Sequence, residues 1–188
     1  MKLLVLTAPS GAGKTTIARR LMAEVPGLQF SVSATTRPPR DGEIDGVHYQ
    51  FLTLGAFSDR LEAGDFLEHE EVYPGRFYGT LRPEMERLAA EADVRAVVLD
   101  IDVKGALNVK RLYGDAALTL FIAPPSLAAL AARLDARGTE DDEQRSVRLE
   151  RAKLEIEYAP EFDAVVINDD LDTAVAETVG RVRAFLDS

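Results

Sequence analysis

Four short runs of consecutive apolar residues recur along the chain, and segments with helical spacing of apolar residues lie between them. The runs cover residues 3–6, 96–99, 118–122 and 164–167, and each predicts a buried strand. Continuous apolar strands that alternate with helices predict an α/β fold, in which helices cover both faces of a central parallel sheet. The longest helical stripe consists of Ala174, Val175, Thr178, Val179, Val182, Phe185 and Leu186.

Two stretches interrupt this alternation. Residues of about 33–83 are rich in turn formers and aromatic side chains, which predicts a small insert of short strands. Residues of about 126–157 are mostly polar and helical, so we expect them to bury little and to form a mobile cover, with Ser126 as helix cap after a hinge at Pro124-Pro125. The remaining residues, about 1–32, 84–125 and 158–188, would then form the core of a single domain covering residues 1–188.

The loop after the first predicted strand carries the clearest chemical signal. A short run of small residues ends in Gly-Lys-Thr and leads into a helix, which is the context of a phosphate-binding loop. Gly11 and Gly13 let backbone N–H groups turn inward toward anionic oxygens, Lys14 reaches the β- and γ-phosphates of a nucleotide, and the Thr15 hydroxyl suits magnesium. The usual pattern begins with glycine, but Ala8 still permits the turn if its φ is negative. The whole segment is Ala8, Pro9, Ser10, Gly11, Ala12, Gly13, Lys14, Thr15 and Thr16.

Carboxylates follow the second apolar run. Asp100 and Asp102 stand at its end, and alternation along a strand would point them the same way. Beside a phosphate-binding loop such residues position magnesium; the alternative is simple solvation at a strand end.

Arginines gather in two places of this otherwise acidic chain. Arg37 and Arg40 flank Pro38-Pro39 in a stiff turn, a pattern that favours a second phosphorylated ligand, although two exposed loop arginines remain the alternative. Arg133, Arg137 and Arg148 lie in the polar helical stretch, where they can neutralise a transferring phosphoryl group or pair with neighbouring acids.

Composition narrows the choice of ligand and location. The 188 residues include 32 Asp and Glu against 22 Lys and Arg, a net charge of −10. This charge argues against nucleic acid as a partner, and an anionic substrate must be held by a local basic cluster. The chain has no cysteine and no apolar run long enough for a membrane span, which favours a cytoplasmic protein without disulfides.

Taken together, the motifs resemble the guanylate kinase family over nearly the whole chain. One motif alone is weak, but nine in the same order are specific. They are Ala8-Pro9-Ser10-Gly11-Ala12-Gly13-Lys14, Ser31-Val32-Ser33-Ala34-Thr35-Thr36-Arg37, Gly42-Glu43, Phe66-Leu67-Glu68, Phe77-Tyr78-Gly79-Thr80, Leu99-Asp100-Ile101-Asp102, Phe121-Ile122-Ala123-Pro124-Pro125-Ser126, Arg137-Gly138 and Val166-Ile167-Asn168-Asp169-Asp170.

The resemblance implies a P-loop NTPase three-layer fold with a GMP-binding insert and a helical lid. It also implies transfer of the γ-phosphoryl group of ATP to GMP or dGMP, with magnesium, in a monomer or homodimer that binds no membrane. By position, Ser33, Glu68, Thr80 and Asp100 would read guanine, and Arg37, Arg40, Tyr49, Tyr78 and Gly79 would hold the rest of GMP. Lys14, Arg133, Arg137 and Arg148 would surround the transferring group, Asn168 would lie near the adenine of ATP, and Thr15 and Asp102 would serve the metal.

The chain departs from the family pattern in a few places. Between Glu68 and Tyr78 it is one residue longer, through Tyr73-Pro74-Gly75, and Arg76 and Phe77 replace common Asn and Tyr. Lys104 replaces a frequent Gln, and Ala136 a frequent Gly. Two alternatives stay open: a related kinase for another phosphorylated acceptor, such as a ribose bisphosphate, and an inactive guanylate-kinase-like interaction module.

Overall fold

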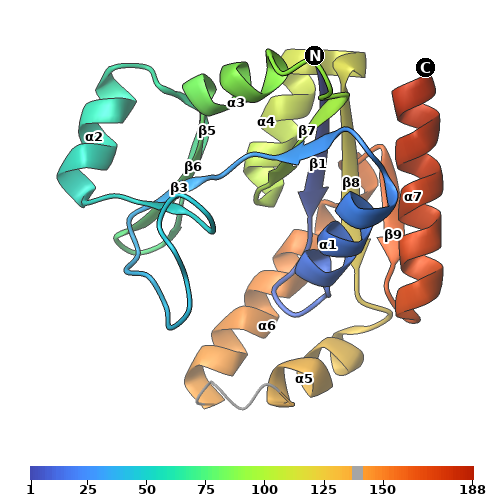
Figure 1. Ribbon diagram of the computed structural model, residues 1–188. Helices are drawn as coiled ribbons and strands as arrows, with labels where there is room; N and C mark the ends of the chain where they lie inside the picture. The colour runs from blue at the N-terminus through green and yellow to red at the C-terminus, as the bar shows by residue number, and fades with distance from the viewer. Residues whose placement is uncertain (137–141) are drawn as a thin grey trace. The chain divides into compact units, whose positions relative to one another are not determined.

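The computed structural model describes residues 1–136 and 142–188 (Figure 1). The fold is α/β, as predicted. A five-stranded sheet has the order β2-β7-β1-β8-β9, and a four-stranded sheet has the order β4-β3-β6-β5. The chain forms two compact units: residues 1–3 and 27–117 make unit 1, and residues 4–26 and 118–188 make unit 2.

The helices and strands follow one another in the order of Figure 1. In chain order they are β1 (Lys2–Thr7), α1 (Lys14–Glu24), β2 (Leu28–Phe30), β3 (Ala34–Thr35), β4 (Gln50–Phe51), α2 (Leu54–Glu62), β5 (Phe66–Tyr73), β6 (Arg76–Leu81), α3 (Arg82–Ala89), β7 (Ala96–Asp100), α4 (Val103–Tyr113), η1 (Gly114–Ala116), β8 (Ala117–Ala123), α5 (Leu127–Asp135), α6 (Asp142–Glu157), η2 (Ala159–Glu161), β9 (Ala164–Ile167) and α7 (Leu171–Asp187).

Unit 2 is built on parallel strands and the helices beside them. β8 and β9 pair in parallel, with Leu120 opposite Ala164 and Ala123 opposite Ile167. α7 packs against α1, and its apolar stripe is buried as the sequence predicts, apart from Phe185, which is half-buried. Because both strands are short apolar runs, their existence and limits follow closely from hydrophobicity alone.

Unit 1 contains the second, mixed sheet. β3 runs parallel to β4 and antiparallel to β6, and β5 pairs antiparallel with β6. Ala34, Phe57, Phe66 and Leu81 form a small core for this sheet. The short strands are those predicted for residues 33–83, but the same stretch also contains α2, which the sequence analysis did not predict. α2 buries only Phe57, while Leu54 and Leu61, which share its helical spacing, stay exposed.

Most described side chains of α5 and α6 are exposed or half-buried, which agrees with the expectation that this stretch buries little. Leu130, Leu134 and Ala152 nevertheless form a small core of their own, with Leu149 packed against it. These few apolar residues of the two helices meet there. The predicted cap is confirmed: the Ser126 hydroxyl accepts a hydrogen bond from the Ala129 N–H at 3.1 Å.

Within residues 1–136 and 142–188, no helix combines the length and the apolar character that crossing a bilayer requires.

The hydroxyl of Ser31 yields a test of the packing in unit 1. This oxygen is buried and has no hydrogen-bond partner among the described residues. Because a buried unpaired hydroxyl costs free energy, we expect Ser31→Ala to leave the free energy of unfolding unchanged or to raise it. Urea denaturation measures this. Thr119→Val is the matched control, since the Thr119 hydroxyl bonds Asp163, and it should lower the free energy of unfolding by about 1–2 kcal/mol. A comparable loss in Ser31→Ala would contradict the expectation.

Candidate functional site

The phosphate-binding loop of unit 2 has the backbone that its sequence predicts. Gly11 and Gly13 adopt φ values of 95° and 97°, which side chains other than glycine rarely tolerate. The loop closes with a hydrogen bond from the Ala12 N–H to the Pro9 carbonyl, at 3.0 Å. No residue other than glycine has a positive φ among the described residues, so Ala8 fits its position without strain.

The first turn of α1 offers its positive end to an anion. Gly13 is the N-cap and supplies no side-chain hydrogen bond, and the first turn contains no acidic residue. The partial positive charge of the helix therefore has no counter-charge from that turn itself, which favours a bound phosphate. Lys14, Thr15 and Thr16 begin the helix at this end.

Asn168 holds the loop in shape from the end of β9. Its side-chain Nδ2 donates to the Ala12 carbonyl at 2.7 Å, and its backbone N–H donates to the Ala123 carbonyl at 2.8 Å. A Cβ atom on Gly13 would lie 2.2 Å from the same Nδ2, so Gly13 is needed for space as well as for its φ. The sequence predicts a place for Asn168 near adenine. Its support of the loop is a different role, which no local motif signals.

Two of the predicted arginines contact this part of unit 2. Arg133 on α5 donates to the Asn168 carbonyl at 2.8 Å, and Arg148 on α6 donates to the Ser10 hydroxyl at 2.9 Å. A Cβ atom on Gly11 would lie 3.0 Å from the Leu134 side chain. The helices α5 and α6 therefore lie against the phosphate-binding loop, while Arg137 is outside the described residues.

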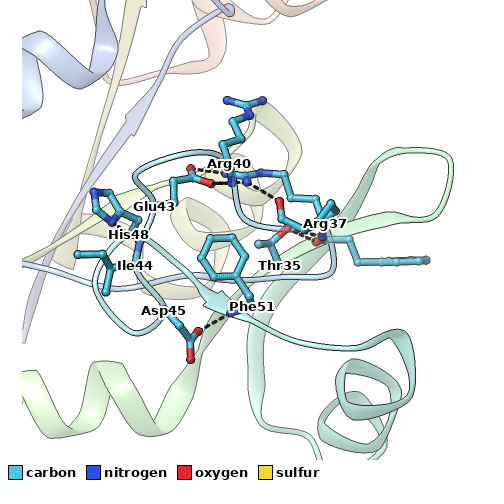
Figure 2. A network of polar contacts seen from close by, with 10 residues as sticks. Thr35, Arg37, Arg40, Glu43, Ile44, Asp45, His48 and Phe51 are labelled. Carbon is cyan, nitrogen blue, oxygen red and sulfur yellow. Dashed lines mark hydrogen bonds and ion pairs between the residues drawn. The ribbon is translucent and has the colours of Figure 1, made fainter.

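In unit 1, Arg37 is buried and held on several sides (Figure 2). Its guanidinium donates to both carboxylate oxygens of Glu43, at 2.6 Å each, and to the Pro38 carbonyl at 3.0 Å. It also lies over the rings of Tyr49 and Phe51, with its Cζ 4.9 and 5.5 Å from their centroids. The bidentate pairing and the ring contacts hold this guanidinium in one position.

Glu43 organises this turn, although the sequence analysis assigned it no role. Besides pairing with Arg37, its carboxylate accepts the Arg40 N–H at 2.7 Å (Figure 2). The hydrogen bonds from Arg37 lower the pKa of Glu43 to about 2. The Arg40 side chain remains exposed. The only local signal is that Glu43 follows Arg40 by three residues in a Gly-containing turn.

Two phenols stand beside this turn. Tyr49 and Tyr78 are half-buried, and their ring centroids lie 6.0 Å apart in an edge-to-face arrangement. Burial raises the pKa of Tyr49 to about 12, with the nearby Asp100 carboxylate adding to the shift. The Tyr49 phenol therefore remains protonated at neutral pH and able to donate a hydrogen bond.

Glu68 is the most unusual acidic group of unit 1. It lies on β5, is 8% exposed, and its Oε1 accepts the Thr80 hydroxyl at 2.6 Å. Burial raises the pKa of Glu68 to about 7, and the Asp102 carboxylate adds to the shift, while the Thr80 hydrogen bonds oppose it. A buried carboxylate with few donors has the capacity to accept more from a ligand. Ser33, on the chain entering the same sheet, is also buried.

The two aspartates at the end of β7 have different surroundings. β7 ends at Asp100, and Asp102 is instead the N-cap of α4, where its Oδ1 accepts the Gly105 N–H at 2.8 Å. Strand alternation therefore does not carry through to Asp102, which corrects the argument that pointed both side chains the same way. Among the described residues, no three or more His, Cys, Asp or Glu side chains form a metal-binding group.

The comparisons with known proteins agree with this geometry. The family model described as guanylate kinase matches residues 1–184. A guanylate kinase of Salinibacter ruber is 60% identical over 99% of this chain and 97% of its own length. One of Chlorobium luteolum is 48% identical over 98% of this chain and 92% of its own length. The crystal structure of guanylate kinase from Anaplasma phagocytophilum has a TM-score of 0.78 at 30% identity, covering 97% of this chain and 85% of that one.

The Arg37–Glu43 pair predicts a specific acid dependence. Because the folded pKa of Glu43, about 2, lies below its usual value of 4.5, the pair stabilises the fold above pH 4.5, and this stabilisation is lost as the pH falls toward 2. We expect the difference in free energy of unfolding between the wild type and Glu43→Gln to shrink across that window. Urea denaturation at several pH values measures it. A difference independent of pH would contradict the expected coupling.

Proposed function

The chain belongs to the guanylate kinase family and is an ATP:GMP phosphotransferase, and we propose which of its residues bind each substrate. Unit 1 supplies the groups for GMP, and unit 2 supplies the groups for ATP. Neither a kinase for a ribose bisphosphate nor an inactive interaction module is favoured, because the family match spans the chain and Lys14 is present in the phosphate-binding loop.

The buried carboxyl of Glu68 is the observation that carries the proposal for GMP. Guanine presents an N1–H and a 2-amino group on one edge, and a carboxylate accepts from both. Adenine offers neither donor there, so a buried carboxylate left unpaired would penalise AMP. We propose that Glu68 reads this edge of guanine, with Thr80, Ser33 and Asp100 completing the recognition of the base.

The monophosphate of GMP, or of dGMP, would bind at the arginine turn. Arg37, fixed by Glu43, and the exposed Arg40 supply positive charge, and Tyr49 and Tyr78 supply hydrogen-bond donors. Gly79 lies in β6 between Tyr78 and Thr80, where a Cβ atom would come within 2.6 Å of Phe66. Because Gly79 has no side chain, β6 can pack closely on β5 at this point, between Tyr78, proposed for the phosphate, and Thr80, proposed for the base.

The phosphate groups of ATP would bind at the loop of residues 8–16. A phosphate oxygen of GMP attacks the γ-phosphorus, the bond to the β-phosphate oxygen breaks, and ADP leaves. The nucleophile is already ionised, so no general base is needed. We propose that Lys14, Arg133, Arg137 and Arg148 neutralise the charge that the transferring group carries, and that Asn168 borders the adenine.

We propose that magnesium accompanies ATP, as is usual for ATP-dependent kinases, where it neutralises phosphate charge. The Thr15 hydroxyl, in the first turn of α1, is an oxygen donor of suitable type. Asp102 also fits by chemistry, but one of its oxygens already caps α4. We therefore expect the phosphates and water to supply most of the metal's ligands.

The remaining proposals concern organisation. We propose that residues 33–83 form the GMP-binding insert and residues 126–157 a lid, within one domain of residues 1–188. The substrates are small nucleotides, and the net charge of −10 argues against nucleic acid as a partner. We further propose a cytoplasmic monomer or homodimer.

An assay of ADP release tests the function directly. With ATP as donor, we expect turnover with GMP and dGMP and little with AMP, UMP, CMP or ribose bisphosphate. Lys14→Ala should lower kcat by about 100-fold or more, because it removes charge stabilisation at the transferring group, while the circular dichroism spectrum stays unchanged. The proposal would be contradicted if the wild type, with ATP as donor, turned over ribose bisphosphate and none of the nucleoside monophosphates. Full activity of Lys14→Ala would also contradict it.

Replacing Glu68 tests the reading of guanine. Glu68→Gln exchanges one acceptor oxygen for a donor, so kcat/KM for GMP should fall by about 10- to 100-fold while KM for ATP changes little. In the wild type, KM for GMP should decrease as the pH rises through about 7, because guanine binds the ionised carboxylate. Glu68→Gln lacks this titration and serves as the control for changes in GMP itself. Equal losses for GMP and ATP would contradict the assignment.

A further inference from the structure

Gly105, in the first turn of α4, lies directly against the carboxyl group of Glu68. A Cβ atom on Gly105 would lie 2.6 Å from Glu68 Oε2 and 3.2 Å from its Cδ. Both residues belong to unit 1, and α4 packs on β5. Lys104 Nζ also reaches Glu70 Oε1 at 2.6 Å, which places the first turn of α4 beside two alternate residues of β5, Glu68 and Glu70.

The backbone does not require glycine at this position. Gly105 is inside the helix and is not among the residues with positive φ, so alanine would fit the backbone and would favour the helix. Its N–H is already used by the Asp102 cap, and a Cβ atom would stand 3.5 Å from Asp102 Oδ1, an ordinary contact. Only the approach of Glu68 explains the missing side chain.

Two residues determine the position of the Glu68 carboxyl group. Thr80 donates to Oε1 at 2.6 Å, and Gly105 leaves space on the side of Oε2. The strand itself is fixed, since Glu68 stands opposite Thr80 in the β5–β6 register. An added methyl group would therefore displace the end of the Glu68 side chain rather than the backbone. Displacing a side-chain end costs little stability but changes the position of the acceptor oxygens.

We propose that Gly105 is a specificity-determining position for the purine base, because its lack of a side chain lets Glu68 present its carboxylate to the guanine edge. This inference rests on the proposed role of Glu68. A comparison of GMP with IMP as substrates separates the contributions of the two donors on that edge, because IMP keeps the N1–H and lacks the 2-amino group. A displaced carboxylate should lose the preference for GMP over IMP as well as some affinity for GMP.

The experiment compares Gly105→Ala with Gly180→Ala. Gly180 is also inside a helix, α7, and a Cβ atom there would meet nothing within 4 Å. We expect Gly105→Ala to lower kcat/KM for GMP by about 10-fold and the GMP/IMP ratio of kcat/KM by a similar factor, as expected when one hydrogen bond is lost. KM for ATP should change less than about 2-fold. Gly180→Ala should keep all kinetic constants and raise the melting temperature by about 2–4 °C.

A double variant adds a test of the mechanism. Glu68→Asp shortens the side chain by one methylene and also moves the carboxylate. Because both substitutions act on one carboxyl group, their effects on GMP should be less than additive in the double variant Gly105→Ala, Glu68→Asp. Additive effects, or an unchanged GMP/IMP ratio in Gly105→Ala, would overturn the inference.

The role of Glu68 is tested separately by Glu68→Gln. If Glu68→Gln leaves the GMP/IMP ratio unchanged, the proposed reading of guanine fails, and the inference about Gly105 fails with it. If Glu68→Gln abolishes the preference for GMP and Gly105→Ala does not, Glu68 keeps its role and only the inference about Gly105 is rejected. Melting temperatures of all variants show whether any loss reflects unfolding.

Discussion

The proposed binding of GMP by unit 1 depends on one physical constraint, the burial of a carboxyl group away from water. Glu68 is buried on β5, and burial raises its pKa to about 7. Thr80 donates a hydrogen bond to one oxygen of this carboxyl group, and the other oxygen packs closely against Gly105. A group that is neither solvated nor fully paired is costly in the empty protein. Protonation relieves part of that cost, and a ligand with donors in the right place would relieve it for the ionised group. In the proposed role of Glu68, an unfavourable feature of the fold would thus become the basis of selectivity.

Arg37 illustrates the opposite solution to the same problem. Its buried charge is balanced inside the protein by Glu43 and by two aromatic rings, so the turn is already ordered before a ligand arrives. A preordered site loses less side-chain entropy on binding. In a chain with a net charge of −10, the proposed anion recognition at this turn would depend on local geometry rather than on the overall electrostatic field. Unit 2 follows the same rule with backbone N–H groups, whose partial charges do not alter the net charge.

How much the sequence predicts depends on the length scale of each interaction. Runs of apolar residues located β1, β7, β8 and β9 to within a residue or two, because burial in a parallel sheet imposes a continuous pattern. β2 has only three residues and was missed, as was α2, which buries Phe57 alone. The phosphate-binding loop is a local motif and was found complete. The closeness of Gly105 to Glu68 and the support of the loop by Asn168 depend on tertiary contacts, for which spacing in one sequence carries no signal.

The bond from Asn168 to the Ala12 carbonyl joins residues 156 positions apart. Because synthesis runs from the N-terminus, the loop is made well before Asn168, which follows Ala12 by 156 positions. Since domains fold as units during synthesis, the nascent loop has its complete sequence long before it has its final support. A fragment that stops short of β9 would contain every residue of the motif and lack the amide that fixes it, so the loop gains this support only after β9 has been made.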